Sequence, residues 1–90
     1  MKVKYKEKEV ELQYSMMTEL LFMEVTKRSY NPESIMDNFY LFWCALQIAY
    51  GEPITYEEVS QYIDNNSQIF ADWINWLADF FSKMEPMKKE

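Results

Sequence analysis

The first fourteen residues alternate between polar and apolar side chains, and this alternation changes phase once. Val3 and Tyr5 are the apolar positions at first, whereas Val10, Leu12 and Tyr14 are apolar afterwards. A single strand cannot move its side chains to the opposite face without a slip in register. The change of phase therefore predicts a β-hairpin over residues 1–14 with a turn near residues 7–8. Pairing would set the lysines of one strand opposite the glutamates of the other, which is favourable across an antiparallel pair.

After the hairpin, apolar residues recur at helical spacing over residues 16–28. Ser15 is a candidate N-cap, and Lys27 and Arg28 would lie in the last turn, where cations interact favourably with the helix dipole. The spacing i, i+3, i+4 and i+8 predicts an inner stripe that packs on the core. The methionines here are interpreted as adaptable core filling, with a binding surface as the alternative. The stripe comprises Met17, Leu20, Leu21 and Val25, with Met16 and Met23 beside it.

Residues 39–50 contain one amide and no charged side chain, so a helix here is apolar around its whole circumference. Such a helix has to be enclosed by the rest of the domain or by a partner. At about 18 Å it is too short to cross a bilayer. The Asn-Pro dipeptide at residues 31–32 predicts its start, and Gly51 marks its end. Trp43 and Cys44, inside the segment, are predicted to be packing residues.

A third helix is predicted from a capping box that begins at Thr55. Glu58 follows three residues later and can accept a hydrogen bond from the backbone amide of Thr55. Ile54 and Val59 have the spacing of a hydrophobic staple across the same helix start. The helix should end near Asp64 because two asparagines follow it.

A fourth, amphipathic helix is predicted over residues 67–84, followed by a loose tail at residues 85–90. One stripe of this helix contains Ile69, Trp73, Trp76, Leu77, Phe80 and Met84, widened by Phe70, Ile74 and Phe81. In one interpretation all these residues pack on the central helix. In the alternative, part of the aromatic surface is exposed and binds another protein, because aromatic side chains are preferred interface anchors. The candidate partner-binding residues are Trp73, Trp76, Phe80 and Phe81.

These elements predict a mainly α (α+β) fold, in which a short N-terminal hairpin precedes four helices packed around the apolar central helix. Residues 15–84 form the helical bundle, and no repeat or linker divides the chain. Residues 1–90 are therefore expected to form a single domain.

The charge distribution argues against nucleic acid as a partner. The net charge is −6, and residues 29–82 contain eight carboxylates and no lysine or arginine. A nucleic-acid surface needs a basic footprint to displace counterions. The N-terminal residues alternate in charge and contain no apolar core of a signal peptide, so the expected location is the cytoplasm, with no membrane association.

The residues available for catalysis are few. The chain has no histidine, one cysteine and one glycine. One thiol cannot form a disulfide within the chain or, without histidine, a metal site, and a single glycine does not make a phosphate-binding loop. We therefore expect no enzymatic activity and no cofactor or metal.

Three segments resemble the small tail assembly chaperones of long-tailed bacteriophages and prophages. The first is residues 10–14 (VELQY), where the strand runs on toward the first helix. The second is residues 22–30 (FMEVTKRSY), and the third is residues 46–49 (LQIA) leading into residues 54–59 (ITYEEV). The resemblance extends over roughly residues 10–81. Members of the family often have glycine in the hairpin turn and after the threonine that ends the first helix, where this chain has Glu7-Lys8 and Lys27.

The resemblance implies a non-enzymatic protein of the host bacterial cytoplasm. It would bind the tape measure protein, keep it from aggregating, and help to recruit tail tube protein before leaving the finished virion. It also implies self-association into open helical or ring-shaped homo-oligomers. The alternative function is that of a small acidic regulator, inhibitor or adaptor that binds a basic protein partner.

Overall fold

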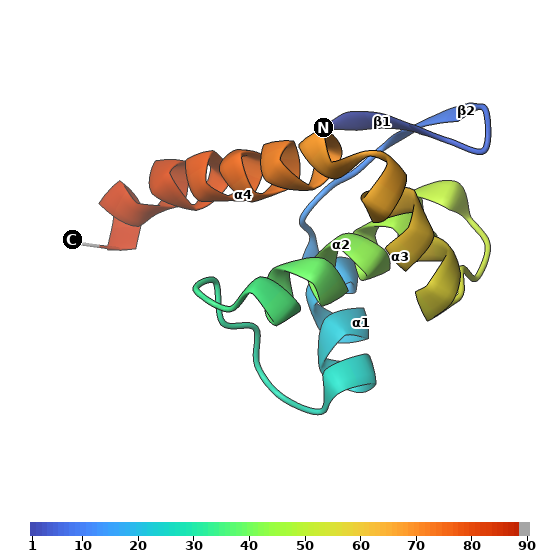
Figure 1. Ribbon diagram of the computed structural model, residues 1–90. Coiled ribbons are helices and arrows are strands. Elements are labelled where there is room, and N and C mark those ends of the chain that lie inside the picture. Colours follow the sequence, from blue (N-terminus) through green and yellow to red (C-terminus); the bar gives the residue numbers. More distant parts are fainter. Residues whose placement is uncertain (89–90) are drawn as a thin grey trace.

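The computed structural model describes the backbone of residues 1–88 and the side chains of residues 1–83. It consists of an antiparallel hairpin followed by four helices (Figure 1), which confirms the predicted fold class. The elements are β1 (Lys2–Tyr5), β2 (Lys8–Glu11), α1 (Met16–Thr26), α2 (Ile35–Tyr50), α3 (Tyr56–Asn65) and α4 (Ser67–Lys88).

The hairpin pairs as the alternation predicts. Val3 lies opposite Val10, and Lys4 lies opposite Glu9, so one face is apolar and the other carries opposite charges. The turn lies at Lys6 and Glu7, one residue before the predicted position. Both turn residues have positive φ, of 49° and 65°. This is the geometry of the tight turns that match the twist of paired strands.

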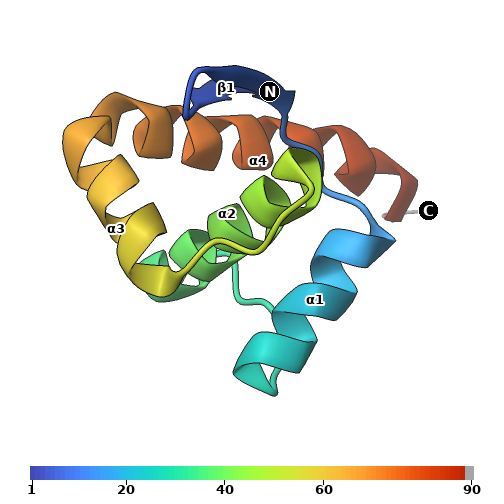
Figure 2. The same ribbon diagram turned by 90° about the vertical axis from the view of Figure 1, so that its right-hand side faces the viewer.

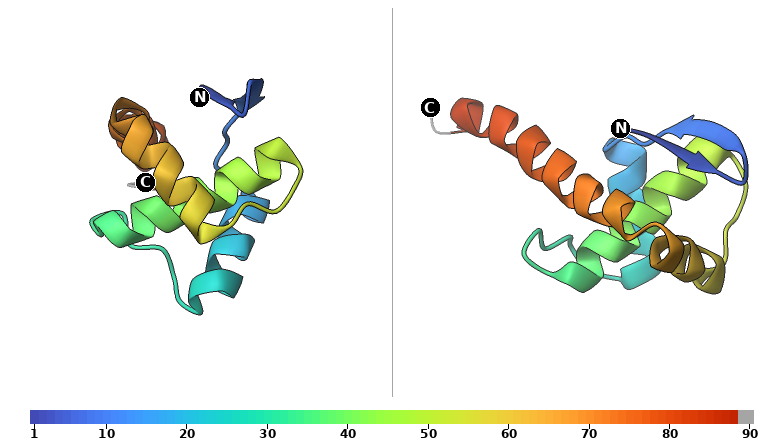
Figure 3. Two further views of the ribbon diagram at one scale, coloured as in Figure 1. Left: turned by 45° about the vertical axis from the view of Figure 1, so that its right-hand side comes forward. Right: turned by 45° about the horizontal axis from the view of Figure 1, so that its top comes forward.

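Helix α2 occupies the middle of the molecule. Figures 1 and 2 show α4 and the hairpin on one side of α2 and α1 on the opposite side, and the two further views in Figure 3 agree. The last turns of α4 extend beyond the body of the protein (Figure 1). Within residues 1–88, no helix has the length and hydropathy that a bilayer span requires.

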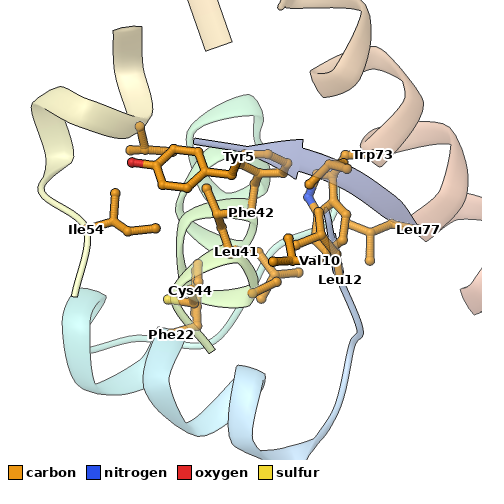
Figure 4. Packing of buried hydrophobic residues seen from close by; sticks show 14 residues of the cluster. Tyr5, Val10, Leu12, Phe22, Leu41, Phe42, Cys44, Ile54, Trp73 and Leu77 are labelled. Atoms are coloured by element: carbon orange, nitrogen blue, oxygen red, sulfur yellow. The ribbon is translucent and has the colours of Figure 1, made fainter. Parts of the chain in front are cut away.

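The core is one apolar cluster to which the hairpin and all four helices contribute. Figure 4 shows hairpin residues and α4 residues meeting over the central helix. The α2 members include Cys44, which is fully buried, so its predicted role in packing agrees with its position. The labelled core residues are Tyr5, Val10, Leu12, Phe22, Leu41, Phe42, Cys44, Ile54, Trp73 and Leu77.

The prediction for α1 is correct at its N-cap and wrong at its C-terminal end. The Ser15 hydroxyl accepts a hydrogen bond from the amide of Thr18, as an N-cap does. The helix ends at Thr26, and Lys27 follows in the left-handed conformation. Lys27 and Arg28 therefore lie beyond the last turn.

The predicted inner stripe of α1 is also wrong. The fully buried side chains of the helix are Thr18 and Phe22, and most members of the predicted stripe face solvent. Thr18 can be buried because its hydroxyl donates a hydrogen bond to the carbonyl oxygen of Gln13 (3.1 Å). Phe22 packs edge-on against Tyr30, with ring centroids 5.6 Å apart. Hydrogen bonding and one aromatic residue thus select a face that apolar spacing alone does not reveal.

Helix α2 starts three residues later than the Asn-Pro signal predicts. Its N-cap is Ser34, whose hydroxyl accepts a hydrogen bond from the amide of Asp37. Asn31 instead caps a turn, because its side-chain oxygen accepts from the amide of Glu33 (3.1 Å). The predicted end is confirmed, since Gly51 terminates α2 with φ of 86°.

The enclosure of α2 is incomplete. Phe39, Tyr40 and Trp43 are only partly buried, and Ile48 is 37% exposed. Part of the apolar circumference therefore faces solvent.

The capping box of α3 is confirmed. Glu58 accepts a hydrogen bond from the Thr55 amide (2.9 Å), and the Thr55 hydroxyl accepts one from the Glu58 amide (3.0 Å). Ile54 and Val59 on either side are both buried.

Helix α4 begins at Ser67 as predicted but continues through Pro86 to Lys88. A loose tail from residue 85 is therefore wrong for residues 85–88. Proline has a φ compatible with a helix but no N–H to donate to the carbonyl oxygen four residues earlier, so α4 continues past Pro86 with one backbone hydrogen bond fewer. The tail residues 89–90 and the side chain of Met84 lie outside the described part of the chain.

Candidate functional site: exposed apolar surfaces for a protein partner

The thiol of Cys44 lies inside the core. Its burial raises the pKa of the thiol to about 11, so the side chain is a protonated thiol near neutral pH. The thiolate is the nucleophilic form of cysteine. Cys44 in this environment is a small apolar packing group.

Trp43 connects the central helix to the loop before α3. Its indole N–H donates a hydrogen bond to the carbonyl oxygen of Ile54 (2.7 Å). Gln47, one turn further along α2, accepts from the amide of Ile54 (3.1 Å). Together these bonds fix the loop that positions Thr55 at the start of α3.

The predicted aromatic site on α4 divides into a core residue and a half-buried cluster. Trp73 is fully buried, and its indole N–H donates to the backbone carbonyl of Asn38 (3.2 Å). It is a core residue, so we remove it from the candidate partner-binding set. Trp76 stacks on Trp73 with ring centroids 5.5 Å apart. Phe80 and Phe81 are half-buried as well.

Tyr14, from the segment after the hairpin, covers part of this cluster. Its ring meets Phe80 and Phe81 edge-on, with centroid distances of 5.7 Å and 5.1 Å. Trp76 also stacks on Phe80 (5.6 Å). The rings of Trp76, Phe80 and Phe81 therefore already contact other aromatic side chains of the same domain. The apolar area that α4 leaves for a partner is smaller than the sequence pattern indicates.

A larger apolar surface lies on the outward side of α1. Met16, Leu20 and Met23 follow each other at i, i+4 and i+7, so they form one stripe, and Met17 is adjacent to it. The exposed fractions of these four side chains run from 40% to 68%. We call Met16, Met17, Leu20 and Met23 the α1 outer face. An open depression of about 380 Å³ adjoins it, lined in part by Met17, Leu21 and Ile48.

A second apolar surface runs along α2 between α1 and α3. Two depressions, of about 450 Å³ and 270 Å³, share Met36 and Tyr56 in their walls. We call the pair the α2–α3 groove. Its first part is lined by Val25, Thr26, Arg28, Met36, Tyr40, Trp43 and Tyr56, and its second part by Ile35, Met36, Phe39, Tyr56, Ser60, Ile63, Asp64 and Phe70.

The surroundings of these surfaces are acidic. All eight charged side chains in residues 29–82 are carboxylates. Three of them are in ion pairs, namely Asp37 with Arg28, Glu58 with Lys6, and Asp79 with Lys83. The hydrogen bonds that Glu58 accepts from the Thr55 amide and from Lys6 lower the pKa of its carboxyl group. The surface around α2 and α3 therefore carries net negative charge at neutral pH.

Sequence reasoning gave a binding surface on α1 only as the alternative for its methionines, and it missed the α2–α3 groove. For α1 a signal was present: Ser15 and Thr18 form a local capping box that holds Thr18 on the inward side. For the groove there was no local signal, because its walls come from elements that meet only in the folded chain.

Comparison of the chain with protein-family models, with curated proteins and with solved structures finds no match.

Proposed function

We propose that this protein is a tail assembly chaperone of a bacteriophage or prophage, a non-enzymatic protein that binds tape measure protein and tail tube protein in the host cytoplasm. The family assignment rests on the resemblance of residues 10–14, 22–30, 46–49 and 54–59. The observation that carries a binding function is the α1 outer face, where four large apolar side chains are exposed on one helix.

The chemistry of the α1 outer face suits an aggregation-prone client. Three of its four side chains are methionines, which are flexible and polarizable and adapt to partners of different shape. A helix with an exposed apolar stripe can pack against the apolar stripe of a client helix. Covering that stripe would remove from water the client surface that drives aggregation.

The acidic surface supports the same function. A net charge of −6 would help to keep the complex with a client in solution. It also attracts basic segments of a client and speeds their association.

Co-expression with a tape measure fragment tests the proposal. The wild-type protein should move the fragment into the soluble fraction and elute with it as one complex. Leu20→Lys on the α1 outer face should strongly reduce the amount of soluble fragment. Gln61→Lys adds the same charge at an exposed position of α3 and should behave as wild type. A fragment that stays insoluble with the wild-type protein would contradict the proposal, and equal rescue by Leu20→Lys would exclude the α1 outer face.

The second candidate is a small acidic regulator, inhibitor or adaptor that binds a basic protein. The observation in its favour is the run of fifty-four residues, 29–82, without a lysine or arginine. In that case the tape measure fragment would remain insoluble, and binding to a basic partner would persist in Leu20→Lys while weakening steeply with added salt.

A further inference from the structure

The geometry points to a second binding site, independent of tail assembly: the α2–α3 groove binds an amphipathic helix of another protein that carries lysine or arginine beside its apolar stripe. The site differs from the α1 outer face in its residues, its shape and its charge.

The shape of the groove matches a helix. Its floor includes Met36, Tyr40 and Trp43, which follow one another along α2 at i, i+4 and i+7. This stripe is about 10 Å long, which corresponds to two turns of a helix. A bound helix laid along the floor would contact it through apolar residues with the same spacing.

The walls of the groove are held in place before any partner binds. Tyr56 packs against three aromatic rings of α2, with centroid distances of 5.5 Å to Phe39, 6.3 Å to Tyr40 and 5.7 Å to Trp43. The hydrogen bond from Trp43 to the loop before α3 fixes the same wall. Preformed walls lower the entropy cost of binding.

Apolar area remains for a ligand at the junction of the two depressions. Met36 is 54% exposed and Ile35 is 71% exposed, although both are large apolar side chains at the start of α2. Between them they line both parts of the groove. Covering these side chains with a partner's apolar stripe would be favourable.

The charge around the groove selects a basic ligand. Asp64 lines its second part, and the only lysine or arginine among its lining residues is Arg28, whose charge is neutralised by the buried carboxylate of Asp37. Asp64 forms no ion pair with any side chain in residues 1–83, and neither does Glu57, which follows the lining residue Tyr56 in the chain. A lysine or arginine beside the apolar stripe of the ligand would meet complementary charge.

The same charge argues against a second copy of this chain as the occupant. The exposed helix that a copy would offer is α1, which carries Glu19 and Glu24 and has no lysine or arginine between Met16 and Thr26. Two surfaces of the same sign repel each other when they are brought together.

Two labelled model peptides test the proposal by fluorescence anisotropy. Both are amphipathic helices with the same leucine stripe, and they differ only in lysine or glutamate on the flanks. At low salt, the peptide with lysine flanks should bind the wild-type protein at least about tenfold more tightly than the peptide with glutamate flanks. The difference should shrink as the ionic strength approaches about 1 M, where the screening length is about 3 Å. Equal binding of the two peptides, or no binding of the lysine peptide, overturns the proposal.

Matched variants locate the site. Met36→Lys in the groove should weaken binding of the lysine peptide by about tenfold or more, because it places a cation in the apolar floor. Met16→Lys makes the same substitution on the α1 outer face and should change the affinity less than about twofold. Circular dichroism should show both variants folded.

Equal weakening of peptide binding by both variants overturns the groove as the site. If the wild-type protein sediments as a dimer and Met36→Lys dissociates that dimer, the occupant of the groove is a second copy of the chain instead. Neither readout uses a tape measure fragment, so failure here leaves the chaperone proposal standing.

Discussion

Arg28 donates two hydrogen bonds to the carboxylate of Asp37, whose side chain is fully buried, across the loop between α1 and α2. The same carboxylate accepts a hydrogen bond from the amide of Asn31 (2.8 Å). Next to it, the buried Asn38 side chain donates to the carbonyl oxygens of Pro32 (3.1 Å) and Ser34 (3.0 Å). Two consecutive polar residues of α2 therefore organise the loop that positions α1, and with it one wall of the α2–α3 groove.

Arg28→Ala should lower the free energy of unfolding by more than the loss of an exposed ion pair does, because it leaves the buried carboxylate of Asp37 without its cation. Arg28→Lys should have an intermediate effect, since an ammonium group cannot make the paired hydrogen bonds of a guanidinium. Urea unfolding followed by circular dichroism measures both variants. A loss as small as that of an exposed ion pair, below about 1 kcal/mol, would show that Asp37 does not depend on Arg28.

Asp37 should also make stability depend on pH. Hydrogen bonds from Arg28, with further ones from the Asn31 amide and the Ser34 hydroxyl, hold the pKa of Asp37 below its usual range despite its burial. Because the folded-state pKa is the lower one, the stabilisation is complete above the unfolded pKa of about 4. It is lost as the pH falls through the folded pKa. Urea unfolding between neutral and acid pH should therefore show a steeper loss for wild type than for Asp37→Asn, and parallel curves would refute this.

Lys27 adopts φ of 64° at the end of α1, where its amide donates to the carbonyl oxygen of Met23 (2.7 Å). Left-handed geometry costs about 1 kcal/mol or more for a residue with a side chain. Lys27→Gly should therefore raise the free energy of unfolding by about 1 kcal/mol. Lys27→Ala removes the same charge but keeps Cβ, so it should give no such gain. If thermal melting shows equal shifts for both variants, the charge and not the backbone is responsible.

The orientation of α1 predicts opposite outcomes for neighbouring residues. Leu20→Lys lies on the α1 outer face and should change the free energy of unfolding by less than about 0.5 kcal/mol. Phe22→Ala removes a fully buried ring and should cost about 3–5 kcal/mol. Urea unfolding of the two variants measures the difference. If Leu20→Lys were as destabilising as Phe22→Ala, Leu20 would be a core residue, as the apolar spacing alone indicates.

The contrast between α1 and α3 explains how far the sequence could predict this structure. The start of α3 depends on Thr55 and Glu58, which are three residues apart and cap each other, so the signal was complete within one turn. The inward face of α1 depends on Thr18, whose hydroxyl donates to the carbonyl oxygen of Gln13, and on Phe22, whose ring packs against Tyr30. The apolar spacing of α1 is compatible with either of two faces being buried. A threonine is not predicted to be a core residue unless the hydrogen-bond partner of its hydroxyl is known.

The candidate binding surfaces were less predictable than the fold for a related reason. In the sequence, α4 has more aromatic residues than the central helix alone could cover. In the structure, Tyr14 from the N-terminal segment covers part of Phe80 and Phe81. The α2–α3 groove needs Tyr56 beside Met36, a neighbour relationship that only the folded arrangement of α2 and α3 creates.

The half-buried cluster on α4 can be separated from the core by its response to truncation. Trp73→Ala removes a fully buried indole and its hydrogen bond to Asn38, and should cost about 3–5 kcal/mol. Trp76→Ala and Phe81→Ala remove partly covered rings and should each cost about 1–2 kcal/mol, with cooperative unfolding retained. Urea unfolding measures all three, and analysis of complex formation with the tape measure fragment shows whether Trp76, Phe80 or Phe81 also contacts the client. Weakened association in a cooperatively folded Trp76→Ala would keep α4 as a partner surface. Unfolding by Trp76→Ala and Phe81→Ala to the same extent as Trp73→Ala would show that the whole cluster belongs to the core.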